Sequence, residues 1–218
     1  MRELEPGLWH WEAPHPGWRP SEPWGEEVSS YAYDDGERLL LFDPLSVPDD
    51  VLERASGREL VVVLTAPWHE RDTQMLVERF GAPVFVAPAD TAEDLMQKYG
   101  ITAEQAGNGS PDLVWLREGG GDARWYAAGD RLPIGVEVFP GREHNDAVLW
   151  VESAGAVVAG DSLVDFGRGF QVADWLRADV QREDVVAGLR PLLDLPVRHV
   201  LPAHGPPTDK AALERALA

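Results

Sequence analysis

The chain has 218 residues, no cysteine and a formal net charge of −19. Because it lacks thiols, it forms no disulfide and no thiolate metal site, and any metal would need histidine and carboxylate ligands. So acidic a surface repels phosphate backbones, which argues against nucleic acid as a partner.

No apolar run approaches the ~18 residues that a membrane-spanning helix needs. The first residues, Met1 to Pro6, lack the apolar core of a signal peptide. We therefore expect one domain over residues 1–218, located in the cytoplasm, without membrane association. No pattern in the sequence indicates an oligomeric state.

The first half of the chain predicts strands followed by an alternation of strands and helices. Strands are predicted at residues 26–33, 38–42, 60–64 and 84–86, and helices at residues 70–80, 91–99 and shortly after Pro48. Asp34-Asp35-Gly36 is typical of a hairpin turn, and the apolar run 60–64 is typical of a strand buried on both faces. The alternation favours parallel pairing in this half.

The second half predicts mainly antiparallel strands and then helices. Strands are predicted at residues 113–116, 124–127, 136–139, 147–151, 156–158 and 199–201, and helices at 174–178, 183–193 and 209–217. Trp125 and Trp150 are expected in the core, whereas Trp18 and Trp24 fit either a packed lid or the aromatic wall of a pocket. The loops 7–25 and 167–175 are candidates for covering a site. The pattern by itself predicts an α/β or α+β fold.

Five short segments carry the residues that suit chemistry. They are Leu-Phe-Asp-Pro at 41–44, Leu-Thr-Ala-Pro-Trp-His-Glu-Arg-Asp at 64–72, Phe-Pro-Gly-Arg at 139–142, Ala-Gly-Asp-Ser-Leu at 159–163 and Leu-Pro-Ala-His-Gly at 201–205. Their order and spacing resemble the metal-binding motifs of the metallo-β-lactamase superfamily. The resemblance, over residues 36–205, implies a four-layer αββα sandwich of two mixed β-sheets with outer helices. In that family, two metals hold a hydroxide that attacks the substrate.

The second segment stands where the family has Thr-His-x-His-x-Asp-His. Without a gap, the ligand positions hold Ala66, Trp68, Glu70 and Arg71. With one inserted residue, they hold His69, Arg71 and Asp72. Both alignments lose at least two metal ligands.

The resemblance assigns the other segments one residue each. Asp43 would be a structural residue that hydrogen-bonds the metal loop. Arg142 replaces a histidine ligand, and His144 lies two residues further on. Asp161 matches the aspartate that bridges the two metals, and His204 matches the last histidine ligand.

Two arginines at ligand positions change the expected electrostatics. A guanidinium is always charged and does not ligate metals, and it repels a cation held ~4 Å away. Arg71 and Arg142 would pair instead with the carboxylates of Asp161 and Glu70, as Arg71–Asp161 or Arg142–Glu70 pairs. Such pairs would balance the site without metal.

The main hypothesis is a superfamily member with a degenerate metal centre and no cofactor, whose pocket binds a small molecule or serves as an interaction surface. Its substrate-binding residues would be Trp68, Arg71, Arg142 and His144. The alternative is a hydrolase of an ester, thioester, lactone or amide with one Zn²⁺, Mn²⁺ or Fe²⁺. Its metal ligands would be His69, Asp72, Asp161 and His204. Asp72 or Glu70 would be the fourth ligand or the general base, and the candidate catalytic residues are His69, Glu70, Asp161 and His204.

Overall fold

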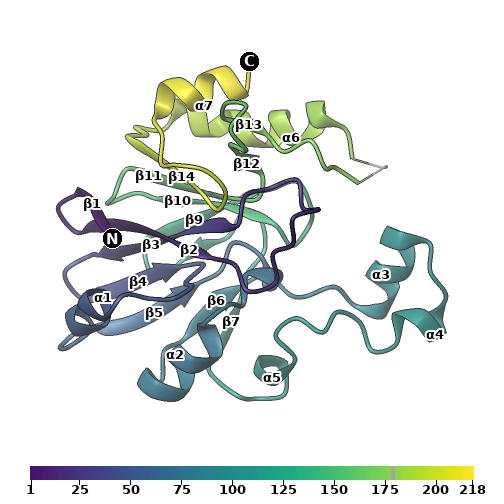
Figure 1. The fold of residues 1–218 in the computed structure, drawn as a ribbon, viewed down its shortest axis with the longest axis horizontal. Coiled ribbons are helices and arrows are strands. Elements are labelled where there is room, and N and C mark those ends of the chain that lie inside the picture. Colours follow the sequence, from purple (N-terminus) through teal and green to yellow (C-terminus); the bar gives the residue numbers. More distant parts are fainter. Residues whose placement is uncertain (178–179) are drawn as a thin grey trace.

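The structure, a computed structural model, describes residues 1–177 and 180–218. Within these residues two large β-sheets stack face to face (Figure 1). The first sheet has the order β1 (Arg2–Glu5), β2 (Leu8–Pro14), β3 (Glu27–Asp34), β4 (Arg38–Phe42), β5 (Glu59–Val63), β6 (Val84–Val86) and β7 (Ala123–Trp125). The second has the order β14 (His199–Pro202), β11 (Ala156–Gly160), β10 (Ala147–Val151), β9 (Val136–Pro140) and β8 (Arg131–Leu132). A small third sheet pairs β12 (Leu163–Val164) with β13 (Gln171–Val172).

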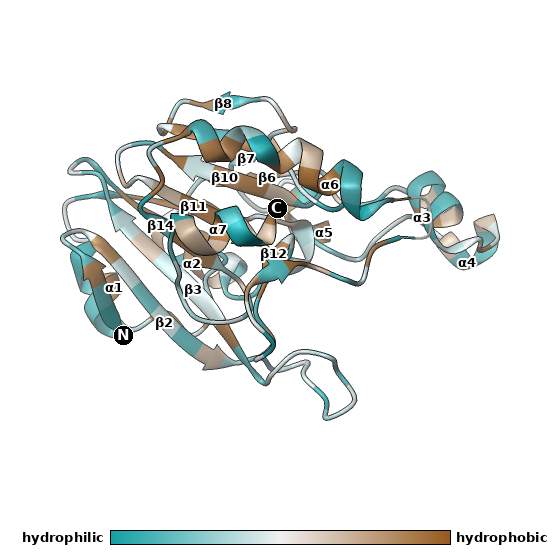
Figure 2. Ribbon diagram, turned by 90° about the horizontal axis from the view of Figure 1, so that it is seen from above, coloured by the Kyte–Doolittle hydropathy of each residue, from teal (hydrophilic) through white to brown (hydrophobic). Residues whose placement is uncertain are grey.

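Helices cover the outer faces of both large sheets. The first sheet is covered by α1 (Asp49–Arg54), α2 (Thr73–Phe80) and α5 (Val114–Arg117), and the second by α6 (Arg182–Leu189) and α7 (Lys210–Ala216) (Figure 1). This layer order is the predicted αββα sandwich. The helices α3 (Ala92–Tyr99) and α4 (Ala103–Ala106) project to one side of the sheets (Figure 2). Among the described residues, no helix is both long and apolar enough to span a bilayer.

Alternate side chains of the central strands enter different cores. On β4, Leu40 and Phe42 pack between the sheets, whereas Leu39 and Leu41 pack against the outer helices. Because successive side chains of a strand point to opposite faces, a strand between two cores has no polar face. This explains the continuous apolar run at 60–64, most of which lies in β5.

The strand pairing agrees with the expected parallel and antiparallel halves. The β3–β4 hairpin is antiparallel around the predicted turn at 34–36, and β4, β5, β6 and β7 pair in parallel. In the second sheet β9, β10 and β11 are antiparallel, and β14 joins β11 in parallel. Consequently β4, β5, β9, β11 and β14 each carry one of the five motif segments at their carboxyl ends.

Two expectations for the middle of the chain are wrong. The predicted strand at 113–116 is the helix α5, since a short apolar run does not by its periodicity separate helix from strand. The carboxylate of Glu70 stabilises the start of this helix by accepting the N–H of Leu113 at 2.7 Å. Trp125 is 44% exposed rather than buried because β7 is the edge strand of its sheet, whereas Trp150 is buried as expected.

The ends of the chain also differ from expectation. Residues 174–177, predicted as part of a helix, are irregular, and residue 178 of that prediction lies outside the described residues. The predicted helix 183–193 is α6 followed by a 3₁₀ turn over Arg190–Asp194, because Pro191 has no N–H to continue the α-helical pattern. The β1–β2 hairpin goes beyond the sequence prediction; its Trp9 and Trp11 are buried under α1 and its neighbours.

Candidate functional site

The candidate site lies at the edge where the carboxyl ends of strands from both sheets meet. Asp43 follows β4, Thr65 follows β5, Asp161 follows β11 and His204 follows β14. Ligands of open α/β sheets bind at this kind of edge. Gly160 lets the two sheets approach, since a Cβ there would lie 2.8 Å from Thr65 Oγ1. The fold therefore brings residues from distant segments together.

Asp43 holds the loop that follows β5. Its Oδ1 accepts the N–H of Thr65 at 2.8 Å, and its Oδ2 accepts the hydroxyl of Thr65 at 2.6 Å. The same Oδ2 lies 3.1 Å from Nδ1 of His69. Asp43 adopts a φ of 46°, a strained conformation for a residue other than glycine, which these contacts hold in place. This geometry fits the structural role that the resemblance implies.

His69 lies between two buried carboxylates. Its Nδ1 faces Asp43, and its Nε2 lies 3.3 Å from Oδ1 of Asp161. Burial opposes the charged imidazolium, but the negative charges of Asp43 and Asp161 outweigh this effect and raise the pKa of His69 to about 9. At neutral pH, His69 is therefore a buried cation whose two ring nitrogens face Asp43 and Asp161.

Asp161 is the centre of the cluster. Its Oδ1 lies 3.4 Å from Nε2 of His204, in addition to His69, and its Oδ2 accepts the indole N–H of Trp68 at 2.9 Å. Burial by itself would raise the pKa of Asp161, but the charge of His69 and the adjacent imidazole of His204 hold it well below its usual range. The carboxylate is thus fully ionised at neutral pH.

Arg142 completes the cluster as a second buried cation, with 7% of the residue exposed. Its Nη2 lies 3.5 Å from Oδ2 of Asp161, and its Nε lies 3.1 Å from Oδ2 of Asp146. Its guanidinium carbon lies 5.4 Å from the ring centres of both Trp68 and Trp175, an arrangement typical of cation–π contacts. The guanidinium is therefore held by charges and by aromatic faces.

The pKa of Asp146 is shifted in the opposite direction from that of Asp161. Burial raises the pKa of Asp146 to about 7, although Arg142 opposes the shift. The hydroxyl of Ser162 donates to this carboxylate at 3.0 Å and in turn accepts the backbone N–H of Arg142 at 2.8 Å. Around neutral pH, the carboxyl group of Asp146 is therefore only partly ionised.

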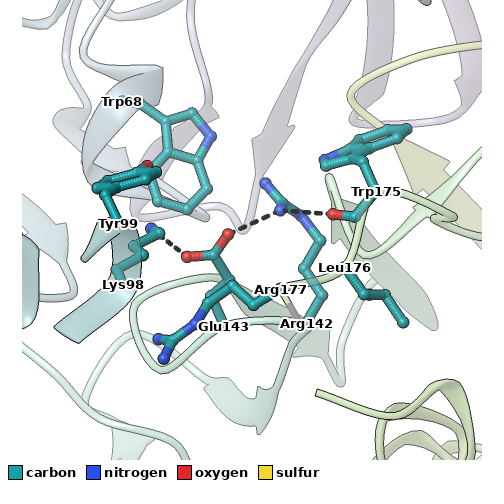
Figure 3. A pocket seen from close by; sticks show the side chains of 8 residues that line it. All are labelled: Trp68, Lys98, Tyr99, Arg142, Glu143, Trp175, Leu176 and Arg177. Atoms are coloured by element: carbon teal, nitrogen blue, oxygen red, sulfur yellow. Dashed lines mark hydrogen bonds and ion pairs between the residues drawn. The ribbon is translucent and has the colours of Figure 1, made fainter. Parts of the chain in front are cut away.

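A pocket of about 500 Å³ opens in front of Arg142 (Figure 3). Its walls are aromatic and its polar groups are charged: the lining includes Trp68, Lys98, Tyr99, Arg142, Glu143 and Trp175. Glu143 reaches toward both Lys98 and Arg142. The volume is in the range of small-molecule sites.

Aromatic rings cover His204 on the other side of the cluster. The ring of Trp24 lies 4.9 Å from that of His204, and Phe166 approaches it edge-on at 5.6 Å. Trp18 donates its indole N–H to the carbonyl of Trp24 at 2.8 Å and so fixes this loop. Of the two interpretations left open for the N-terminal tryptophans, Trp24 fits the packed lid, because it packs on the cluster of Ala13, Val28 and Leu45 and does not line the pocket in front of Arg142, and Trp18 supports it.

Within the described part of the chain, the side chains of four residues proposed from the sequence form no ion pair or hydrogen bond with Asp161, His69 or His204. Glu70 binds α5, and Oδ2 of Asp72 accepts the backbone N–H of Ser46 at 2.6 Å. Arg71 donates to backbone carbonyls, including that of Asp43 at 2.6 Å. His144 is exposed and does not line the pocket. The inserted-residue alignment thus places His69 well, but the residues after it turn away.

The expected ion pairs are therefore wrong in their partners. Arg142 lies beside Asp161, the partner expected for Arg71. The expected partner of Arg142, Glu70, has its two oxygens bound by the Leu113 N–H and, at 2.6 Å, by the indole N–H of Trp115. The physical reason is that the amide at the start of α5 has no acceptor within that helix and takes the carboxylate of Glu70 instead.

Replacing Glu70 with alanine is expected to lower the free energy of unfolding by about 1–3 kcal/mol, because the donors of Leu113 and Trp115 lose their acceptor. Urea unfolding of the Glu70→Ala variant measures this loss. The matched control is Glu78→Ala, since Glu78 is exposed on α2 and accepts a hydrogen bond from the nearby side chain of Gln74. Equal effects in the two variants would contradict the assignment of Glu70 to α5.

Several residues of the site were missed in the sequence, among them Lys98, Tyr99, Glu143, Asp146 and Trp175. Lys98 comes from α3, which no motif connects with the strand ends. The sequence feature that sets Lys98 apart is that the chain has only one other lysine, Lys210. Tyr99 belongs to the same helix, and Glu143 and Asp146 lie just after a motif segment but have no counterpart in it.

A second group of possible ligands lies beside the pocket. Ligand atoms of Asp90, Asp94 and His144 lie within 4.8 Å of one another. Asp90 also pairs with Lys98 at 3.1 Å and accepts an amide hydrogen of Asn145 at 3.0 Å. A cation bound there would have to share Asp90 with the ammonium group of Lys98.

Comparison with known proteins supports the fold. No family model and no curated protein sequence matches the chain. A protein solved in a di-iron-bound form, TTHA1623, is similar, with 26% identity, a TM-score of 0.58, and coverage of 87% of this chain and 93% of that one. An archaeal metallo-β-lactamase superfamily protein from Sulfolobus tokodaii has 16% identity, a TM-score of 0.65 and coverage of 97% and 84%. A metallo-β-lactamase family protein from Thermus thermophilus has 20% identity, a TM-score of 0.60 and coverage of 98% and 78%.

Proposed function

This chain has the fold of the metallo-β-lactamase superfamily, and we propose that it uses the fold to bind a small molecule without a two-metal centre. The observation that carries the proposal is the place of Arg142, whose buried guanidinium lies 3.5 Å from the carboxylate that matches the metal-bridging aspartate. The ion pairs of this cluster would then hold the pocket's shape, a task that metals perform in a dinuclear member.

A dinuclear centre fits the residues poorly. Both cations would need nitrogen and carboxylate ligands, but Arg142 fills one ligand position and Ala66 or Arg71 another. His69 and Arg142 already balance the charge of Asp161 and Asp146. Two divalent cations added beside them would meet strong repulsion in a buried site.

A single metal is the alternative, and a specific observation favours it. Nε2 of His69 and Nε2 of His204 both face Oδ1 of Asp161, and that oxygen is buried without a well-formed hydrogen bond. These residues would hold one Zn²⁺, Mn²⁺ or Fe²⁺, which would supply an activated water for hydrolysis of an ester, thioester, lactone or amide. Asp72, whose carboxylate binds Ser46, would not take part.

The spacing of the three side chains weighs against this alternative. Bonds of about 2.1 Å to one metal keep its ligand atoms within about 4.2 Å of one another. In the described part of the chain, the group with three ligand atoms within 4.8 Å is Asp90, Asp94 and His144, and the trio around Asp161 does not meet this limit. The two imidazoles would have to move toward each other to bind the same ion.

Elemental analysis of protein purified without a histidine tag tests the proposal. We expect less than about 0.1 equivalent of transition metal per chain after exposure to Zn²⁺, Mn²⁺ or Fe²⁺ and desalting, because Arg142 and His69 already neutralise Asp161. One equivalent that is lost in His204→Ala would support the mononuclear alternative. Two equivalents would contradict both. The Asp90→Asn variant is the control that identifies metal held at the second group.

A further inference from the structure

The pocket contains a carboxylate of its own that joins its two buried cations. Oε1 of Glu143 lies 2.9 Å from Nη1 of Arg142, and its Oε2 contacts Nζ of Lys98 (Figure 3). All three side chains are 7% exposed. Lys98 belongs to α3 and Arg142 follows β9, so one carboxylate links two separate elements across the pocket. Each of its oxygens contacts one cation, and the carboxylate of a bound organic ligand would be held by the same two contacts.

Both cations have ion-pair partners other than Glu143. Lys98 retains Asp90 at 3.1 Å, and Arg142 retains Asp146 and Asp161. These other carboxylates lie behind the cations, whereas Glu143 is the acidic residue in the pocket's lining as far as the chain is described. Removal of the Glu143 charge would therefore leave Lys98 and Arg142 paired but with donors directed into the pocket.

The pocket walls suit a flat ring. Trp68, Tyr99 and Trp175 line it, and Tyr99 is 62% exposed although its ring is largely apolar. Lys98 Nζ lies 5.6 Å from the ring centres of both Trp68 and Tyr99, so the cations sit against the aromatic faces. A flat ring bound between these faces would stack on them and remove Tyr99 from water.

We propose that the pocket binds a small aromatic monocarboxylate, whose carboxylate displaces Glu143 from between Lys98 and Arg142. The inference rests on the proposed function, since it requires Arg142 at its present place. A volume of about 500 Å³ accommodates a ligand of two or three fused rings. A single negative charge fits best, because Asp90, Asp146 and Asp161 lie behind the cations and repel a dianion.

Glu143 would then be an internal competitor of the ligand. Each binding event must first release its carboxylate, so the measured affinity is the intrinsic affinity multiplied by the fraction of molecules in which Glu143 is already displaced. The Glu143→Gln variant keeps the size of the side chain and removes its charge. It should bind the ligand more tightly, which is the opposite of what a ligand-contacting residue would show.

Calorimetric titration with 2-naphthoate tests the inference. We expect binding, with the neutral 2-naphthamide and the dianionic 2-naphthyl phosphate each at least about tenfold weaker, because they lack the single charge that the cations accept. Glu143→Gln should tighten naphthoate binding by about tenfold, and Lys98→Met should weaken it by a similar factor through loss of one charged hydrogen bond.

Controls separate the pocket from general effects. Tyr99→Ala should weaken binding, whereas Trp125→Ala should not, since Trp125 is an exposed aromatic residue on β7 that is absent from the pocket's lining. Unchanged melting temperatures would show that each variant is folded. The inference is overturned if naphthoate binds no better than naphthamide, if Glu143→Gln fails to tighten binding, or if no binding occurs at about 1 mM in either protein.

The metal content of the same preparations separates this inference from the proposed function. Metal-free protein that does not bind naphthoate would overturn this inference but not the proposed function. Protein with stoichiometric metal at the Asp161 cluster would overturn the proposed function, and naphthoate binding that remained sensitive to Glu143→Gln would then still assign the ligand class.

Discussion

Replacing Asp161 with alanine is expected to lower the free energy of unfolding by about 3–5 kcal/mol, because it leaves buried cations without a shared partner. The carboxylate lies 3.3 Å from His69 and 3.5 Å from Arg142, and it accepts the indole N–H of Trp68. Burial of a charge without its counter-ion is among the largest effects of a single substitution. Urea unfolding at pH 7 measures the loss.

The control for this variant is the exposed ion pair of Asp122 and Arg124. Their side chains are 51% and 57% exposed, although their atoms approach to 2.7 Å. Asp122→Ala removes the same chemical group, but solvent screens the pair, so its stability should hardly change. Asp161→Asn should fall between the two variants because it keeps a polar group at Trp68. A stability of Asp161→Ala equal to that of Asp122→Ala would remove the basis for a charge-balanced site.

The fold was predictable because its signals are local and repeated. The apolar run at 60–64 and the turn at 34–36 indicated β5 and the β3–β4 hairpin directly. The helix α3 had a clear beginning, since Thr91 and Asp94 form the reciprocal hydrogen bonds of a capping box. The short run at 113–116 failed because its helix depends on Glu70, a contact between residues distant in sequence.

The candidate site was predictable only at the ends of its strands. Asp43, Asp161 and His204 follow strands in motif segments, and the structure brings them together: Asp43 and Asp161 flank His69, and His204 lies beside Asp161. The alignment of the loop after β5 could not be decided from the sequence, because a 3₁₀ turn over Pro67–His69 sets which side chains point inward.

The charged lining of the pocket could not be inferred in the same way. Lys98 reaches the site from α3, and Glu143 acts through the position of its carboxylate between two cations. Neither relation leaves a pattern in the sequence. Such contacts depend on where a projecting helix sits relative to the sheets, which only the three-dimensional structure provides.

Stability is expected to fall by about 3 kcal/mol as the pH rises from 6.5 through about 9, because the folded chain holds the proton of His69 more tightly than the unfolded chain. Burial by itself would lower the pKa of His69, but the charges of Asp43 and Asp161 outweigh it and raise that pKa from 6.5 to about 9. The contribution of His69 is complete below pH 6.5 and is lost as the imidazolium loses its proton near pH 9.

Other buried groups act in different pH ranges. The pKa of Asp146 is raised to about 7 by burial, so its effect on stability develops between pH 3.8 and 7. The pKa of His10 is lowered to about 4 by burial, and its contribution is therefore complete above pH 6.5. The decline between pH 7 and 9 thus belongs mainly to His69.

Urea unfolding at a series of pH values between 6 and about 10 measures this decline. His69→Gln should lower stability at pH 6.5 and flatten the curve between pH 7 and 9, since an amide can still donate to one of the two carboxylates but does not titrate. His10→Gln is the matched control: His10 is also a buried histidine, bonded to Ser29 at 2.9 Å, but it is neutral in this range. Its variant should retain the slope of the original chain. A slope that survives in His69→Gln would show that His69 is not the buried cation between these carboxylates.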